Sequence, residues 1–150
     1  MVKKIIGFIF ILFLVGCSKK EYVTCNIDIN NTKENYHMNG VYNIYYDGNY
    51  VTKIIKQETY VSSDDAMIEY FNESKSLEYY NLNDLYGGVT YKIKENDKSI
   101  NLDVVIDMNS MNVKEMVKDN YIDKNYVVSN KLTLTGAKYI YESKGAKCDI

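Results

Sequence analysis

The feature that most constrains the fold of this chain is a regular alternation of side chains between residues 100 and 108. Apolar residues occupy every second position from Ile100 to Met108, and Asn101, Asp103 and Asp107 lie between them. A period of two with one apolar face predicts a half-buried strand of an antiparallel sheet. Such a strand needs neighbouring strands and a second layer that covers its inner face.

Other segments have the composition and period of strands. Tyr, Val, Ile and Thr are frequent in residues 22–29, 40–46, 50–61 and 89–94. Asp47-Gly48 separates two of these segments and favours a tight hairpin turn. In residues 50–61 the period places Val51 and Ile55 on one face, and on the other face Tyr50, Ile54 and Tyr60.

Three segments are predicted to be helical. The first runs from about residue 63 to about residue 80, because Ser62-Ser63-Asp64-Asp65 can cap a helix start. Its apolar residues at helical spacing are predicted to face the core, the alternative being a face that binds a partner: Met67, Tyr70, Phe71 and Leu77. A short helix is predicted around 113–117. A last helix runs from about Leu134 to Lys144, with Gly145 placed to end it and with these inward residues: Ala137, Ile140 and Tyr141.

Strands interrupted by helices without a regular alternation indicate an α+β fold. We therefore expect an antiparallel sheet of about five strands packed with two to three helices.

The first sixteen residues have the pattern of a bacterial lipoprotein signal peptide. Lys3 and Lys4 precede the apolar run from Ile5 to Val15, and Gly16 stands directly before Cys17. We predict cleavage between Gly16 and Cys17 and a diacylglycerol on the Cys17 thiol, which is enough acyl chain for a stable anchor. The alternative, a transmembrane anchor, needs about twenty apolar residues.

This pattern divides the chain into a signal peptide, residues 1–16, a lipidated N-terminus with a short tether, residues 17–21, and a single domain, residues 22–150. The predicted location is the extracytoplasmic face of the cell membrane. Removing the signal peptide also removes two of the 18 Lys and Arg residues, so the net charge changes from −2 to −4. An acidic chain without arginine has no footprint for nucleic acid. We expect no nucleic-acid partner.

Once Cys17 carries lipid, Cys25 and Cys148 remain. Two thiols in one domain outside the cytoplasm commonly pair, so a disulfide is predicted, the alternative being two buried free thiols. The bond would close a loop of 123 residue steps. In the chain-entropy model such a loop is worth about 4 to 5 kcal/mol.

Four stretches occur in an order that resembles the YehR-type family of small bacterial lipoproteins, which is defined by a domain of unknown function. They are Tyr46–Lys53, Gly87–Ile93, Val104–Asp107 and Glu142–Gly145. The likeness covers nearly the whole mature chain and includes Cys17. It implies a compact α+β domain on a lipid anchor, and it brings no catalytic residues.

The chain offers little for catalysis, and we expect it not to be an enzyme. His37 is the single histidine, and near a strand start it is more readily a surface or capping residue than a general base. We expect no metal site and no cofactor. Asp64-Asp65 and the pair Asp103 and Asp107 are more simply explained by helix capping and by a solvated strand face.

Two function hypotheses remain. The sequence favours a non-catalytic envelope binding module that holds a small ligand, a peptide or another envelope protein. The alternative is a structural or accessory lipoprotein without a discrete ligand. Three strand tyrosines would favour the first hypothesis if they formed an exposed, concave aromatic face: Tyr42, Tyr46 and Tyr91. Because Asn, Lys, Ile and Tyr are all abundant, an AT-rich genome is the simpler reason for the sixteen tyrosines.

Overall fold

The computed structural model describes residues 21 to 149. The predicted signal peptide, Gly16 and Cys17 lie outside the described residues. Within residues 21–149 no helix combines the length and the apolar character needed to cross a bilayer.

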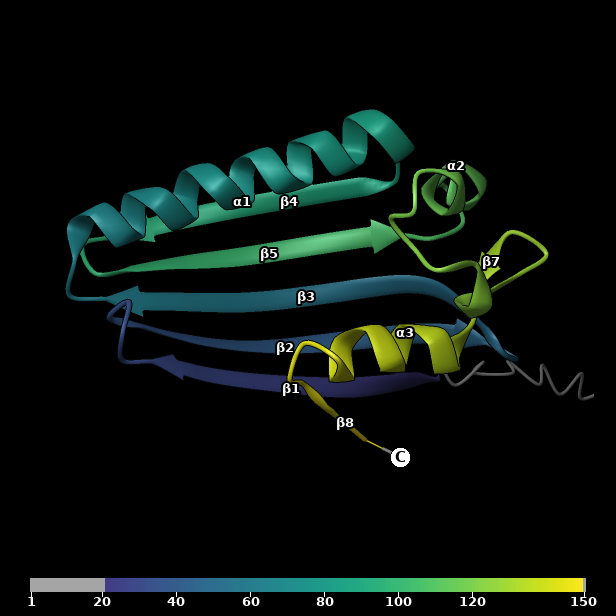
Figure 1. The fold of residues 1–150 in the computed structure, drawn as a ribbon, viewed down its shortest axis with the longest axis horizontal. Coiled ribbons are helices and arrows are strands. Elements are labelled where there is room, and N and C mark those ends of the chain that lie inside the picture. The colour runs from purple at the N-terminus through teal and green to yellow at the C-terminus, as the bar shows by residue number, and fades with distance from the viewer. Residues whose placement is uncertain (1–20, 150) are drawn as a thin grey trace, which may run out of the picture.

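The described residues form a six-stranded antiparallel sheet covered by helices on one face (Figure 1). Its strand order is β4-β5-β3-β2-β1-β8. The strands are β1 (Tyr22–Asn31), β2 (Tyr36–Asp47), β3 (Tyr50–Ser62), β4 (Val89–Asn96), β5 (Ser99–Asp107) and the short β8 (Lys147–Cys148). The helices are α1 (Asp65–Tyr86), α2 (Val113–Lys118) and α3 (Leu134–Glu142). A 3-10 turn, η1 (Lys124–Tyr126), leads into a two-stranded hairpin of β6 (Val127–Val128) and β7 (Lys131–Leu132). The predicted α+β class is confirmed.

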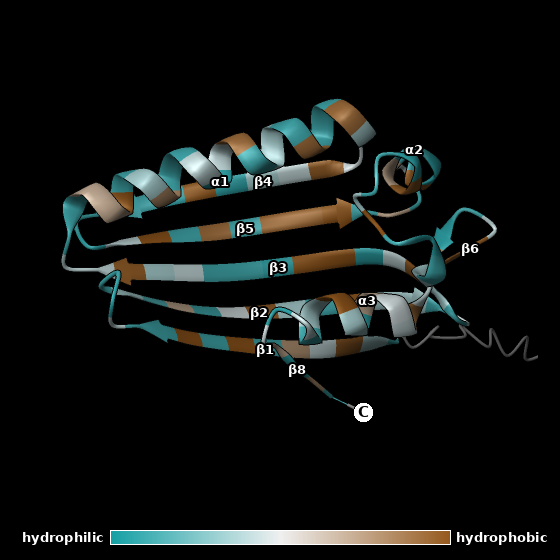
Figure 2. Ribbon diagram, in the orientation of Figure 1, coloured by the Kyte–Doolittle hydropathy of each residue, from teal (hydrophilic) through white to brown (hydrophobic). Residues whose placement is uncertain are grey.

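The helices pack on the same face of the sheet but over different strands. Helix α1 contacts β3, β4 and β5, and helix α3 contacts β1, β2 and β3 (Figure 1). Alternation along β5 suits this two-layer arrangement, because Ile100, Leu102 and Val104 are all buried. Figure 2 shows β5 as a mainly hydrophobic strand. The buried apolar residues of the whole described region form one cluster. Residues 21–149 therefore share one core.

The other face of the sheet is open and mainly polar. Side chains there pair across strands: the Thr24 hydroxyl donates to Asn43, and the Thr59 hydroxyl donates to Asn101, each at 2.9 Å. Such cross-strand pairs fix the register without needing a covering layer.

The hairpin between β2 and β3 turns at Gly48, whose φ of +57° suits the predicted tight turn. The predicted faces of β3 are partly wrong. Ile54 and Tyr60 are buried together as expected, but Val51 is buried as well, whereas Ile55 lies on the open face. The register shifts between Tyr45 and Tyr46, so one extra residue of β3 is accommodated there. The extra residue shifts the alternation of β3. Val51, which precedes it, therefore points to the face opposite to the one that a strict period of two predicts.

Helix α1 differs most from the prediction. It begins after Asp64, whose side chain accepts from the Ala66 amide at 3.0 Å, and it continues to Tyr86. Of the predicted core stripe only Phe71 is fully buried, whereas Tyr70 and Leu77 are each 60% exposed. The residues that α1 buries are Ile68, Phe71, Tyr79, Leu82 and Tyr86.

The prediction failed because the buried stripe of α1 contains a charged residue. Lys75 lies within it, between Phe71 and Tyr79, and interrupts the apolar period. Tyr70 precedes Tyr79 by nine residues, which is two and a half turns, so the two tyrosines lie on opposite sides of the helix.

Helix α3 ends at Glu142, two residues before the predicted end, and Gly145 closes the following turn with a φ of +94°. The inward residues Ala137 and Tyr141 are buried as predicted, and Ile140 is half-buried. The chain then pairs with β1 through β8, where Cys25 lies opposite Cys148. The structure contains the Cys25–Cys148 disulfide.

Candidate functional site

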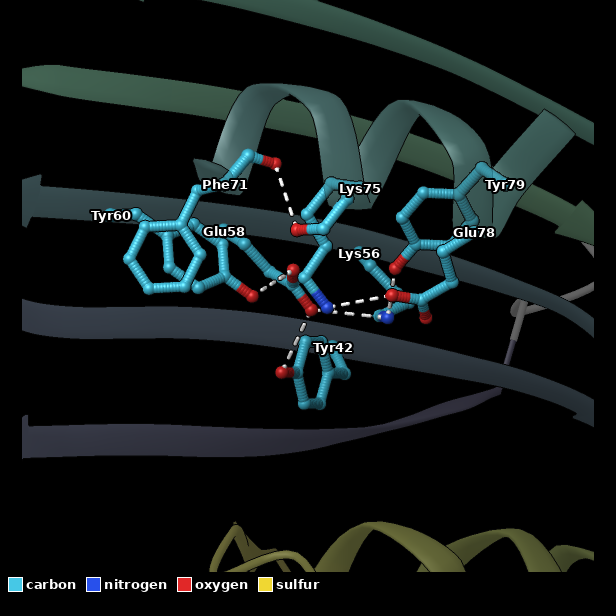
Figure 3. A network of polar contacts seen from close by, with 9 residues as sticks. Tyr42, Lys56, Glu58, Tyr60, Phe71, Lys75, Glu78 and Tyr79 are labelled. Carbon is cyan, nitrogen blue, oxygen red and sulfur yellow. Dashed lines mark hydrogen bonds and ion pairs between the residues drawn. The ribbon is translucent and has the colours of Figure 1, made fainter. Parts of the chain in front are cut away.

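Strand β3 places two charged side chains on the face that the helices cover. Lys56 and Glu58 are two residues apart, so both point inward. The Lys56 ammonium lies 3.0 Å from a Glu58 carboxylate oxygen, and only 3% of the Glu58 side chain is exposed (Figure 3). A buried ion pair of this kind is uncommon, because both charges lose their hydration.

Tyrosine hydroxyl groups complete the environment of this pair. The Tyr42 hydroxyl donates to Oε1 of Glu58 and the Tyr60 hydroxyl donates to Oε2, each at 3.0 Å. The Lys56 ammonium also donates to the hydroxyl of Tyr79, which comes from α1 (Figure 3). Within residues 21–149 no buried side-chain nitrogen or oxygen lacks a hydrogen-bond partner.

The network keeps its two charges. Burial acts to raise the pKa of Glu58, but Lys56, Lys75 and the Tyr42 hydroxyl together outweigh it and the pKa is lowered. Burial acts to lower the pKa of Lys56, but Glu58 and the other negative groups around it together outweigh burial and the pKa is raised. Burial, followed by the Glu58 charge, raises the pKa of Tyr42 and of Tyr60 far above 10. Lys56 is therefore a protonated donor and not a nucleophile.

A cavity of about 420 Å³ lies beside this network, between α1, α3 and the segment that follows α2. Its floor combines the Lys56 ammonium with the apolar side chains Ile54, Ile106, Met108, Met111, Met116 and Leu132. The rim consists of exposed residues: Glu78 from α1, Tyr121 and Asp123 from the segment after α2, and Lys144 from the turn after α3. The cavity is thus a mostly apolar space with charged groups at one end and at its mouth.

This arrangement is suited to binding. Pockets for small molecules commonly measure 300–1,000 Å³ and combine apolar walls with a few placed polar groups. Methionine side chains adapt to irregular apolar shapes, and three of them line this cavity. Within residues 21–149 no group of three His, Cys, Asp or Glu side chains gathers in a way that could hold a metal ion.

The residues that sequence reasoning examined for chemistry have structural partners instead. His37 lies 2.7 Å from Asp28 on the open face of the sheet. Asp64 caps α1, and the neighbouring Asp65 pairs with Lys98. Asp107 accepts hydrogen bonds from Asn109 and Ser110 in the turn after β5, and Asp103 accepts one from Gln57. None of these residues lines the cavity.

The strand tyrosines Tyr42, Tyr46 and Tyr91 do not form the exposed aromatic face that would favour a binding module. Tyr42 is buried, with 4% exposed, and its ring packs against Tyr141 of α3. Tyr91 is 37% exposed and lies beside Tyr79.

Sequence reasoning also missed Lys56 and Glu58. The sequence did carry a signal for both residues. They occupy every second position of β3 together with Ile54 and Tyr60, which face inward.

Comparison with known proteins shows likeness in structure alone. No protein-family model and no curated protein matches the chain in sequence. The NMR structure of E. coli YehR is similar to it, with a TM-score of 0.54 and 17% identity, over 87% of this chain and 92% of that chain. An NMR structure of a protein from Streptococcus pneumoniae TIGR4 has a TM-score of 0.48 and 14% identity, over 99% of this chain and 94% of that chain. The first of these comparisons shows that the chain has a YehR-like fold.

Proposed function

We propose that this chain is a lipid-anchored protein of the extracytoplasmic membrane face that binds one small, largely apolar ligand in the cavity between α1 and α3. The observation that carries the proposal is the cavity itself, whose lining is mostly apolar. A chain that only needed a core would lose stability by leaving such a space empty.

The signal-peptide pattern around Gly16 and Cys17 supports the anchor. The start of the first described strand fits such an anchor, because β1 begins at Tyr22, only five residues after Cys17. Five residue steps of extended chain span at most about 18 Å, so the lipid on Cys17 would hold the domain close to the membrane surface.

Ligand binding is tested with N-phenyl-1-naphthylamine, a neutral dye that fluoresces in apolar surroundings, and purified residues 18–150. We expect saturable binding with one site per chain. Ile140→Trp should weaken binding about tenfold or more, because residue 140 lines the cavity and the larger ring would occupy it.

Val105→Phe is the matched control, because it enlarges an apolar side chain on the open face of the sheet. It should leave dye binding unchanged. Thermal unfolding of each variant separates loss of the cavity from loss of the fold. Absence of saturable binding by the wild-type protein, or unchanged binding by a folded Ile140→Trp variant, would refute the binding function.

The anchor is tested separately by labelling growing cells with an alkyne analogue of palmitate. We expect the full-length protein to incorporate the label and to fractionate with membranes. Cys17→Ala should abolish both results, whereas Cys148→Ala should keep the label. Labelling that persists in Cys17→Ala would contradict lipidation at this residue.

A further inference from the structure

The cavity has an apolar end and a polar end. At the apolar end, Met108 follows β5 and its amide donates to Thr52, close to the hairpin turn of β2 and β3. Helix α3 starts near this turn, where the Leu134 amide donates to Asn49, and it runs back along the sheet toward β8 (Figure 1). Lys144, which follows α3, therefore lies toward the opposite end of the cavity, where Lys56 is.

The charged groups that line the cavity differ in whether they have an ion-pair or hydrogen-bond partner. Lys56 pairs with Glu58 at 3.0 Å, and Glu78 pairs with Lys75 at 2.7 Å. The Asp123 carboxylate caps η1 by accepting from the Asn125 amide at 2.8 Å. Lys144 is different, because among residues 21–149 no carboxylate lies within 4.0 Å of its ammonium.

The surroundings of Lys144 favour an anion. Partial burial, and after it the positive charge of Lys56, lower the pKa of Lys144, although the carboxylates of Glu78 and Glu58 act in the opposite direction. A negative group in direct contact with the Lys144 ammonium would add to the effect of these carboxylates. Hydrogen bonds between an ammonium and a carboxylate are also stronger than those between neutral groups.

Resting on the proposed binding function, we propose that the ligand is an amphipathic anion, an alkyl chain that ends in a carboxylate. Its chain lies among Met108, Met111 and Met116, and its carboxylate accepts from the ammonium of Lys144. The Lys56 ammonium, which is paired with Glu58, lines the same end of the cavity.

The aromatic residues of the cavity present the opposite possibility, a cationic ligand. Tyr79, Tyr121, Tyr126 and Tyr141 all line the space, and tyrosine rings can hold a quaternary ammonium group. Four charged side chains line the same space, however, and three of them already have partners: Lys56, Glu78 and Asp123. Lys144 has no ion-pair partner among residues 21–149. The charge distribution therefore favours the anion.

Three amphiphiles with the same twelve-carbon chain test the head group: dodecanoate, dodecanol and dodecyltrimethylammonium. Each competes with N-phenyl-1-naphthylamine for purified residues 18–150, below the concentration at which it forms micelles. We expect dodecanoate to displace the dye at a concentration about tenfold lower than either of the other two. Tenfold is the size of effect that one added charge-assisted hydrogen bond can produce.

Lys144→Gln should remove the preference for dodecanoate, measured relative to dye binding by the same variant, and Lys144→Arg should keep the preference. Lys147→Gln is the matched control, because this exposed lysine lies three residues away and does not line the cavity.

Equal displacement by all three amphiphiles, or a preference for the cation, would overturn the assignment of an anion while dye binding upheld the proposed function. A preference that survives in Lys144→Gln would overturn the role of Lys144. Failure of the dye itself to bind would overturn the proposed function and this inference together.

Discussion

Lys56 and Glu58 occupy consecutive inward positions of β3, with 3.0 Å between the ammonium nitrogen and Oε1. Replacing Glu58 by Gln would leave the Lys56 charge buried without its counter-ion. Removing one partner of such a pair typically costs about 3 to 5 kcal/mol. We expect Glu58→Gln to lower the free energy of unfolding by that amount, measured by urea denaturation.

The double variant Lys56→Met, Glu58→Gln is the control for this prediction. It removes the buried charge that Glu58→Gln leaves unpaired, and it keeps an acceptor for the Tyr42 and Tyr60 hydroxyls. The two substitutions should therefore cost less together than the sum of their single effects, by about 1 kcal/mol or more. Additive effects would show that the pair is not coupled.

The same network predicts how stability depends on pH. The lowered pKa of Glu58 contributes stability above the ordinary value of 4.5, and this contribution is lost as the pH falls through the lower folded value. Burial first, and then neighbouring charges, raise the pKa of Tyr42, Tyr60 and Tyr79, and burial raises the pKa of Tyr141 to about 12. Because unfolded tyrosines ionise near 10, the protein should lose stability above pH 10.

Denaturation curves from pH 3 to pH 11 test this expectation, with a stability maximum between roughly pH 5 and pH 9. Glu58→Gln should reduce the loss on the acid side, because its side chain does not titrate. A loss on the acid side that is the same in the variant and in the wild-type protein would assign it to other carboxyl groups.

Gly88 is predicted to be intolerant of any side chain. Its φ is +75°, and a Cβ there would lie 2.6 Å from the Asp107 carbonyl oxygen and 2.7 Å from Cγ of Met111. Gly88→Ala should therefore cost about 2 kcal/mol or more, from backbone strain and from the displaced contacts. Gly48→Ala is the matched control, since its φ is +57° but a Cβ would meet nothing within 4 Å. Its cost should be the smaller of the two in thermal or urea unfolding.

Loss of the disulfide is expected to destabilise the domain. Cys25→Ala with Cys148→Ala should lower the free energy of unfolding by about 2 to 5 kcal/mol, because the bond spans 123 residues of sequence. Titration of the unreduced, unfolded wild-type residues 18–150 should find no free thiol. Finding two would contradict the bond.

The elements that could be predicted from the sequence are those in which a local period and the tertiary environment agree. Strand β5 has an uninterrupted alternation and is buried on one side, and Gly48 provides the turn between β2 and β3. The inward face of the first helix was predicted only in part, because Lys75 occupies an inward position and pairs with Glu78. The inward face of a helix is predicted from the spacing of its apolar residues, and a charged residue on that face interrupts the spacing.

The candidate site was less accessible to sequence reasoning than the fold. Its lining comes from β3, β5, α1, α2, α3 and the segments between them, and no local pattern indicates that these parts enclose a cavity. A lysine and a glutamate in a strand ordinarily indicate a solvated position. Their burial depends on Tyr42 of β2 and Tyr79 of α1 as well as on Tyr60 of the same strand, and only the tertiary structure brings these residues together.

The disulfide also determines how the domain responds to mechanical force. Tension applied between the two ends of the described chain would pass from the first residues of β1 to Cys25, across the sulfur–sulfur bond to Cys148, and on to Asp149. Residues 26 to 147 form a closed loop outside this path and bear no load. A protein tethered to a membrane at its N-terminus and pulled at its C-terminus would therefore keep most of its sheet, together with α1, α3 and the cavity, out of the path of the force.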